Sequence, residues 1–109
     1  MKQAYSVLWT AVAEHDLNEI ITYIAQDNVS HAESILRTIT KSASRLQHSP
    51  KRGRILPELR THGITVYREL IIAPWRLIYR ISDRTVLVLA LLDSRRNIED
   101  LLLQRLLQQ

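Results

Sequence analysis

The sequence predicts an α+β protein, in which a short strand and two amphipathic helices precede a mainly antiparallel sheet and a further helix ends the chain. Two observations support this prediction. Apolar residues recur at helical spacing through residues 11–47, and strand-like patterns replace them through residues 66–92. We expect about four strands, because residues 5–9 (YSVLW) form one and three follow the helices. At this length, residues 1–109 should form a single domain.

The two helices are expected to form an antiparallel hairpin. Leu17 begins a series of apolar residues at i, i+3, i+4 and i+7, which predicts a helix over about residues 11–26. A second stripe of this kind continues to about Gln47. Ser30 and Glu33 have the spacing of a capping box, so we expect Ser30 to cap the second helix. The short connection between the helices favours a hairpin that covers the sheet.

The composition changes abruptly at His48. Residues 48–63 contain both glycines, two of the three prolines, and four basic residues against one acidic residue. We interpret this segment as a long loop, and loops carried on a rigid scaffold often bind ligands. Arg54 and Arg60 are therefore candidate binding residues, with a solvated basic linker as the alternative.

The strand over residues 75–81 alternates between two faces. Its odd-numbered residues are apolar and should face the helices, which places Arg76 and Arg80 on the other face. If the preceding turn is even-membered, residues whose numbers add up to 147 pair across it. Glu69 then lies on the face of Arg76, while Arg68 points toward the core side. An odd-membered turn would exchange the two faces.

The last strand should be central, because residues 85–92 are almost continuously apolar. The sequence Asp93-Ser94-Arg95-Arg96 leaves the sheet, and Asn97 is a possible cap for the C-terminal helix. The leucine-rich face of that helix could belong to the core or could dock a partner helix. The residues of this helical pattern are Ile98, Leu101, Leu102, Arg105 and Leu106.

The charge distribution suggests an acidic partner. The net charge is +4, and residues 48–109 carry eleven basic residues against six acidic ones. Ten of the eleven are arginines, whose planar guanidinium groups suit phosphate or carboxylate. There is no cysteine, which excludes disulfides and thiolate metal sites. No signal peptide or apolar run of the ~20 residues needed for a membrane span is present, so we expect a cytoplasmic protein without a membrane partner.

In this order, the segments resemble the RelE/ParE superfamily of type II toxin–antitoxin toxins. The resemblance covers nearly the whole chain, although no single motif is specific. The matching pieces are DLNEIITYIA, P-x-x-G-R at Pro50 to Arg54, P-E-L at Pro57 to Leu59, G-I-x-x-Y-R-E-L at Gly63 to Leu70, W-R-L-I-Y-R-I at Trp75 to Ile81, and R-R-x-x-E-x-L-L from Arg95. The resemblance implies a toxin without cofactor or metal, in a hetero-oligomer with an acidic, partly disordered antitoxin.

One branch of this superfamily cleaves translated mRNA on the ribosome. By resemblance to that branch, Glu58 occupies the position of a catalytic carboxylate, and Arg76 and Arg68 those of phosphate-binding arginines. That branch often ends its last strand in a His–Tyr or Arg-plus-Tyr set, where this chain has Asp93. A carboxylate there would repel phosphate and would not readily donate a proton near neutral pH. The loop residues His48 and His62 could substitute for the missing acid.

Members of the other branch are ParE-like toxins, which poison DNA gyrase and stabilise plasmids. The Arg-Arg ending followed by an extra segment favours this branch, although many members have His at the position of Asp93. An mRNA interferase is the alternative, followed by an inactive or retargeted homologue. A DNA-binding module is disfavoured, because no helix has a basic recognition face. The residues expected to contact the target or antitoxin are Arg54, Arg60, Arg76, Arg80, Asp93, Arg95 and Arg96.

Overall fold

The computed structural model describes residues 4–107 and confirms the α+β fold. A five-stranded sheet has the order β1-β5-β4-β3-β2, in which β1 is parallel to β5 and the other neighbouring pairs are antiparallel. A 3₁₀ turn over Arg45–Gln47 follows the second helix. In chain order, the strands and α-helices are β1 (Ser6–Trp9), α1 (Ala11–Ala25), α2 (Val29–Ser44), β2 (Arg54–Ile55), α3 (Pro57–Arg60), β3 (Tyr67–Ile72), β4 (Trp75–Ser82), β5 (Thr85–Asp93) and α4 (Ile98–Leu107).

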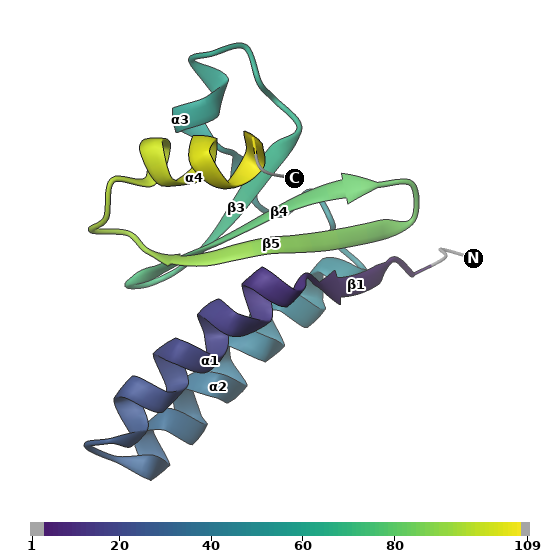
Figure 1. Cartoon of the computed structure of the whole chain (residues 1–109). Coiled ribbons are helices and arrows are strands. Elements are labelled where there is room, and N and C mark those ends of the chain that lie inside the picture. The colour runs from purple at the N-terminus through teal and green to yellow at the C-terminus, as the bar shows by residue number, and fades with distance from the viewer. Residues whose placement is uncertain (1–3, 108–109) are drawn as a thin grey trace.

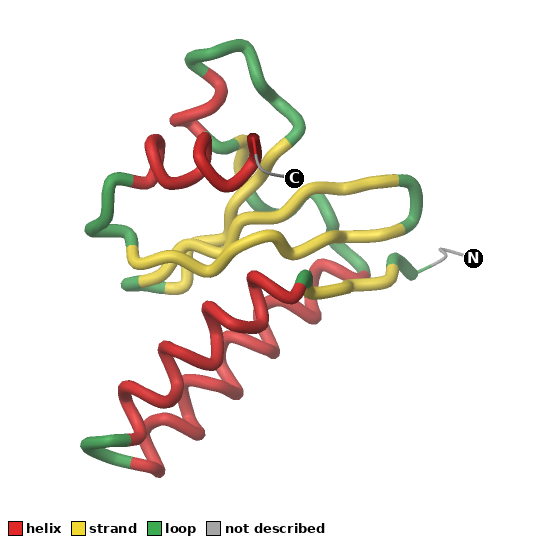
Figure 2. The backbone as a smooth tube through the Cα atoms, in the orientation of Figure 1, coloured by secondary structure: helices red, strands yellow, loops and turns green. Residues whose placement is uncertain are grey.

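The sheet separates two groups of helices. The hairpin of α1 and α2 lies against one face and extends beyond the sheet, whereas α3 and α4 lie over the other face (Figures 1 and 2). The first core, under the hairpin, includes Ala13, Ile39 and Tyr79. The second core, under α3 and α4, includes Ile78 and Leu102. Both faces of the central strands are therefore buried, as the apolar sequence of β5 predicts.

The C-terminal helix belongs to the core of its own chain. Leu102 is 1% exposed and packs in the second core. The side chain of Asn97 accepts a hydrogen bond from the Asp100 backbone amide at 3.3 Å, in agreement with its predicted capping role. The side chains of Ile98 and Leu106 lie outside the described residues. No helix within residues 4–107 is long and apolar enough to cross a bilayer.

The predicted register of the β3–β4 hairpin is correct in its even-membered form. Tyr67 pairs with Arg80, Ile72 pairs with Trp75, and every intermediate pair adds up to the same number. This register puts Glu69 beside Arg76, on the face covered by α3 and α4. Residues of both faces therefore lie where the alternation of β4 predicts.

The predicted cap of the second helix is wrong. The N-cap is Asn28, whose backbone is extended and whose side chain accepts from the amide of His31 at 3.0 Å. Ser30 lies inside α2, one residue after its first position. Asparagine caps helices as well as serine does, and Asn28 precedes Ser30 in the chain, so the helix begins earlier than predicted.

Residues 48–63 are more ordered than the predicted loop. They contain β2, which pairs with β3 as a fifth strand, and the single turn of α3. Pro57 begins α3, while Leu56 and Leu59 are fully buried in the second core. The hydroxyl of Tyr79 donates to the carbonyl of Pro50 at 2.7 Å and accepts from the amide of Gly53 at 2.9 Å. This segment is therefore held against the sheet by the Tyr79 hydroxyl, by strand β2 and by its buried leucines.

One buried carboxylate joins three distant elements beside β5. Strand β1 pairs with β5 only as far as Val88, so the rest of that edge of β5 has no strand next to it. There the side chain of Asp16, on α1, accepts a hydrogen bond from the amide of Leu91 at 3.0 Å. The guanidinium of Arg105, on α4, donates to the same carboxylate at 2.8 and 3.1 Å. Asp16 thus shields the open edge of β5 and connects the first and last helices.

Candidate functional site

The structure divides the predicted site residues between two places. Asp93, Arg95 and Arg96 line a groove on the side of the helical hairpin. Glu58, Arg54 and Arg76 meet on the opposite face of the sheet. The seven residues expected to bind a target or antitoxin therefore do not form one continuous surface, and each place has its own chemistry.

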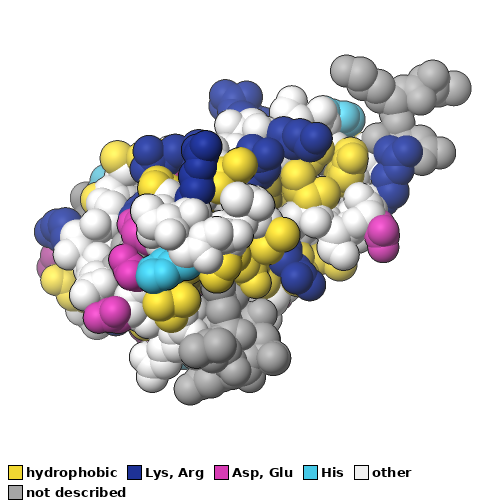
Figure 3. All heavy atoms as spheres, turned by 90° about the horizontal axis from the view of Figure 1, so that it is seen from above, with side chains coloured by type: hydrophobic (Ala, Val, Ile, Leu, Met, Phe, Trp, Pro, Cys, Tyr) yellow, Lys and Arg dark blue, Asp and Glu magenta, His cyan; other side chains and the backbone are white. Residues whose placement is uncertain are grey.

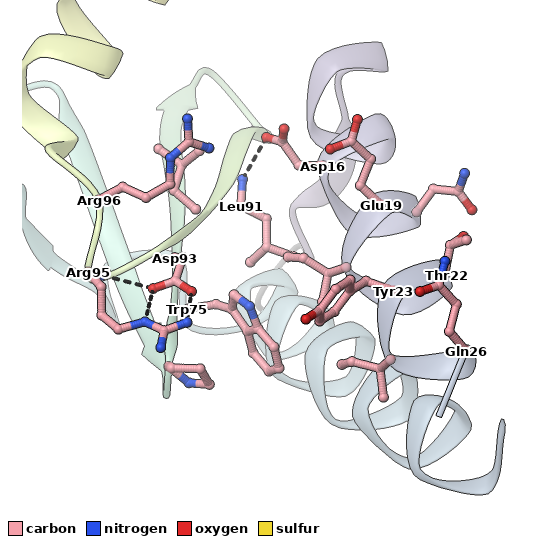
Figure 4. Close-up of a pocket in the computed structure, with 15 residues that line it drawn as sticks. Asp16, Glu19, Thr22, Tyr23, Gln26, Trp75, Leu91, Asp93, Arg95 and Arg96 are labelled. Carbon is pink, nitrogen blue, oxygen red and sulfur yellow. Dashed lines mark hydrogen bonds and ion pairs between the residues drawn. The ribbon is translucent and has the colours of Figure 1, made fainter. Parts of the chain in front are cut away.

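The groove has a volume of about 630 Å³ and runs between α1 and the end of β5 (Figure 4). Its wall on α1 includes Tyr23, which is 73% exposed, and Trp75 faces it from the start of β4. An open aromatic surface bordered by polar and charged side chains is suited to binding a partner. The lining residues are Asp16, Asn18, Glu19, Ile20, Thr22, Tyr23, Ile24, Gln26, Pro74, Trp75, Leu91, Leu92, Asp93, Arg95 and Arg96.

At the end of the groove, Asp93 and Arg95 form a two-point ion pair. The carboxylate of Asp93 accepts from Nε and Nη2 of Arg95 at 3.0 and 2.6 Å, and also from the Arg95 backbone amide at 2.9 Å. These hydrogen bonds lower the pKa of Asp93 to about 2. Figure 4 shows Arg95 folded back onto Asp93, whereas Arg96 extends away from them.

On the other face, Arg54, Glu58, Glu69 and Arg76 form an arginine–glutamate network. Arg76 donates through Nε to Glu69 and through both terminal nitrogens to Glu58, at 2.5 and 2.7 Å. Arg54 donates to the second carboxylate oxygen of Glu69 at 2.5 Å. The side chains of Glu69 and Arg76 are 0% and 9% exposed, while that of Glu58 is 25% exposed. Two carboxylates and two guanidinium groups thus pair with one another, with Glu69 and Arg76 in the interior and Arg54, whose side chain is 62% exposed, at the surface.

Mutual pairing fixes the charge of this network. Hydrogen bonds from Arg76 hold the pKa of Glu58 below its usual value of 4.5. The two carboxylates in turn raise the pKa of Arg76, with Glu58 as the largest cause. Arg76 was expected on the working face of the sheet, yet it is buried and three of its guanidinium nitrogens are bonded to glutamates. The structure therefore places Arg76 on the predicted face of the sheet, with its guanidinium nitrogens already paired.

Arg68 does not join Glu58 and Arg76. It lies on the hairpin side of the sheet, where its Nη1 donates to the carbonyl of Gly53 at 2.8 Å. The three residues proposed for catalysis are thus split between the two faces of the sheet.

Arg60 and Arg80 are both exposed. The space-filling view from above shows Lys and Arg side chains gathered along one border of the molecule (Figure 3).

The two loop histidines also lie apart from the network. His62 Nε2 is 2.9 Å from the Glu99 carboxylate, so it connects the segment after α3 to the start of α4. His48 is exposed directly after the 3₁₀ turn. Neither histidine contacts Arg76 or Glu58 among the contacts of the described residues.

Acid should weaken the fold partly through Glu58. Because its pKa is lower in the folded protein, the stability from its pairing with Arg76 is fully present above pH 4.5 and is lost as the pH falls below that value. Urea unfolding between about pH 7 and pH 3 should show this loss, and Glu58→Gln should reduce the slope. Equal slopes in wild type and Glu58→Gln would contradict the prediction.

Several residues of the site were not singled out from the sequence. Tyr23 and Trp75 lie 52 positions apart in the printed sequence, so their shared groove depends on the packing of the hairpin against the sheet. Asp16 had a usable signal, because it falls three residues after buried Ala13 and four before Ile20, on the apolar stripe of α1. An acidic residue in such a stripe indicates a buried partner.

The sequence and the fold are similar to those of known toxin–antitoxin proteins. The family model described as the ParE toxin of the type II toxin–antitoxin system parDE matches residues 7–98. Toxin ParE3 of Caulobacter vibrioides is 30% identical over 93 residues, which cover 84% of this chain and 89% of that protein. The chromosomal ParDE system of P. aeruginosa has a similar fold, with a TM-score of 0.67 and 20% identity over 84% of this chain and 98% of that one. The RelBE2 toxin–antitoxin complex of Mycobacterium tuberculosis gives a TM-score of 0.60 and 26% identity, with coverages of 85% and 94%.

Proposed function

We propose that this chain, which belongs to the ParE toxin family of type II toxin–antitoxin systems, inhibits growth by poisoning DNA gyrase. A cognate acidic antitoxin neutralises it. The observation that favours gyrase over mRNA is the pairing of Arg76 with Glu58 and Glu69. In this arrangement, the residues that would perform phosphate chemistry bind one another. A plasmid that carried such a toxin with its antitoxin would be stabilised.

RNA cleavage makes demands that this pairing opposes. A base must accept the proton of the 2′-hydroxyl, and cations must stabilise the charge that develops on the phosphate. Glu58 is occupied by two hydrogen bonds from Arg76, and its lowered pKa makes it a weaker base. Arg76 would have to break a buried ion pair before it could bind phosphate, at a cost of several kcal/mol.

The contact between Glu58 and Arg76 also supports an alternative function, that of an mRNA interferase. If substrate opened this pair, the exposed carboxylate and guanidinium would have the residue types of a ribosome-dependent mRNA interferase. Glu58→Gln would then abolish cuts on translated messages, whereas it should leave gyrase inhibition intact under our proposal. The two functions therefore give opposite results with one variant.

The groove supports the antitoxin partner. It presents apolar and aromatic side chains beside Arg96 on a chain with a net charge of +4. An acidic segment with apolar residues would cover this surface and neutralise the arginine. We therefore place part of the antitoxin contact in the groove, in a hetero-oligomer of toxin and antitoxin that forms in the cytoplasm.

The expected result is inhibition of purified gyrase. Added protein should stop plasmid supercoiling and accumulate cleaved DNA, and the antitoxin should reverse both effects. Glu58→Gln should inhibit as strongly as wild type, because the proposed activity involves no RNA chemistry at this residue. The same samples should be tested in a translation extract, with the message mapped for cuts. Normal supercoiling at a large excess of toxin, together with cuts that require Glu58, would reject the gyrase proposal.

A further inference from the structure

The turn after β5 carries two arginines with different electrostatic environments. Arg95 donates through Nε and Nη2, along one edge of its guanidinium, to both carboxylate oxygens of Asp93, two residues earlier. Arg96 lines the same groove, and its side chain has no hydrogen-bond or ion-pair partner among the described residues. Adjacent arginines would offer two cations to a partner, but one of them is already neutralised here.

The contact between Asp93 and Arg95 is held by the backbone as well as by charge. The Asp93 carboxylate also accepts from the amide of Arg95 at 2.9 Å, so the turn itself keeps the acid in place. The Asp93 side chain is only 24% exposed, whereas that of Arg95 is 81% exposed. A partner could therefore reach Arg95, yet it would meet a guanidinium whose charge is compensated nearby.

The opposite wall of the groove limits where an acidic partner can place its charge. Glu19 lies on that wall and pairs with His15 at 2.6 Å. Asp16 also lines the groove and is occupied by Arg105 and the Leu91 amide. A carboxylate near α1 would meet exposed Glu19, whereas one near the end of β5 would meet Arg96.

We propose that Asp93 determines partner specificity in this groove by holding Arg95, which leaves Arg96 to receive a single carboxylate from an otherwise apolar antitoxin segment. The inference rests on the proposed antitoxin partner and assigns the chemistry of one contact. Apolar side chains of the segment cover Tyr23 and Trp75, and its acid lies beside Arg96. A segment with two adjacent acids gains little from its second charge, because Arg95 is already paired.

The test measures affinity for the cognate antitoxin by calorimetry with wild type and four variants. Arg96→Gln should weaken binding about tenfold, as expected for the loss of a partly desolvated charge pair. Arg95→Gln should weaken it to a similar degree, because the freed Asp93 carboxylate then opposes the field of Arg96. Asp93→Asn in the Arg95→Gln background should restore binding to within about twofold of wild type. Asp93→Asn alone should tighten binding severalfold, since both arginines are then free, while Asn keeps the acceptor for the Arg95 amide.

The restoration distinguishes a positioning role from direct contact. If Arg95 bound the antitoxin itself, the double variant would bind as weakly as Arg95→Gln, and the inference would be wrong. Unchanged affinity in Arg96→Gln would also overturn it. Failure of the wild-type protein to bind any antitoxin would instead reject the proposed partner together with this inference. Thermal melting of each variant shows that a change in affinity does not reflect unfolding.

Discussion

Replacement of Glu69 by alanine should lower the free energy of unfolding by about 3–5 kcal/mol, the usual cost of removing one partner from a buried ion pair. Glu69 is fully buried and accepts from Arg76 on one carboxylate oxygen and from Arg54 on the other. Without it, Arg76 remains in the interior with only Glu58 as a counter-ion. Urea unfolding followed by Trp fluorescence would measure the loss.

Glu58→Ala is the matched control for this prediction. It removes the same kind of side chain from the same guanidinium, but Glu58 is partly exposed and its loss leaves the pair of Arg76 with Glu69 intact. Water can reach the vacated position, so we expect a smaller cost of about 1–2 kcal/mol. A loss from Glu58→Ala that equals or exceeds the loss from Glu69→Ala would show that burial does not dominate in this network.

Gly53→Ala should destabilise the protein by about 3 kcal/mol or more, the upper range for overpacking a core. A methyl group at this position would overlap the backbone carbonyl oxygen of Glu69 and would lie 2.7 Å from the Tyr79 hydroxyl oxygen. The backbone cannot yield as a flexible side chain would. Relief therefore requires residues 50–53 to move away from β3 and β4, which breaks the two hydrogen bonds of the Tyr79 hydroxyl.

Gly63→Ala separates this steric effect from the general effect of replacing glycine. Gly63 has a φ of +78°, with open space where the methyl group would lie. Only the left-handed backbone opposes alanine there, at a cost of about 1–2 kcal/mol. Chemical denaturation should give Gly53→Ala a much lower free energy of unfolding than Gly63→Ala. The reverse order would mean that the contact with Tyr79 adapts easily.

The sequence predicts the parts of this fold that have long, regular patterns. Helical spacing around Leu17 and alternation along β4 predict α1 and the face of the sheet that the hairpin covers, because burial itself imposes these periods. The β3–β4 register followed once the turn length was taken as even. This register predicts that Glu69 and Arg76 share one face of the sheet, as the structure shows.

Short elements escaped prediction for a physical reason. Strand β2 has two residues and α3 has four, which is too short for a period to be recognised. Their order comes from tertiary contacts, namely pairing with β3 and the burial of Leu56 and Leu59. The burial of Arg76 also escaped prediction. Alternation assigns a residue to one face of the sheet, but it does not tell whether α3 and α4 cover that face.

The parallel pairing of β1 with β5 has a consequence for synthesis of the chain. Ser6 lies opposite Thr85, so the first strand completes the sheet only after the last strand has been translated. Such nonlocal pairing gives a high contact order and slow folding. Nascent chains that end before β5 lack the strand that joins β1 to the rest of the sheet, as well as one wall of the groove. The sheet and the groove proposed for the antitoxin are therefore completed only after β5 has been synthesised.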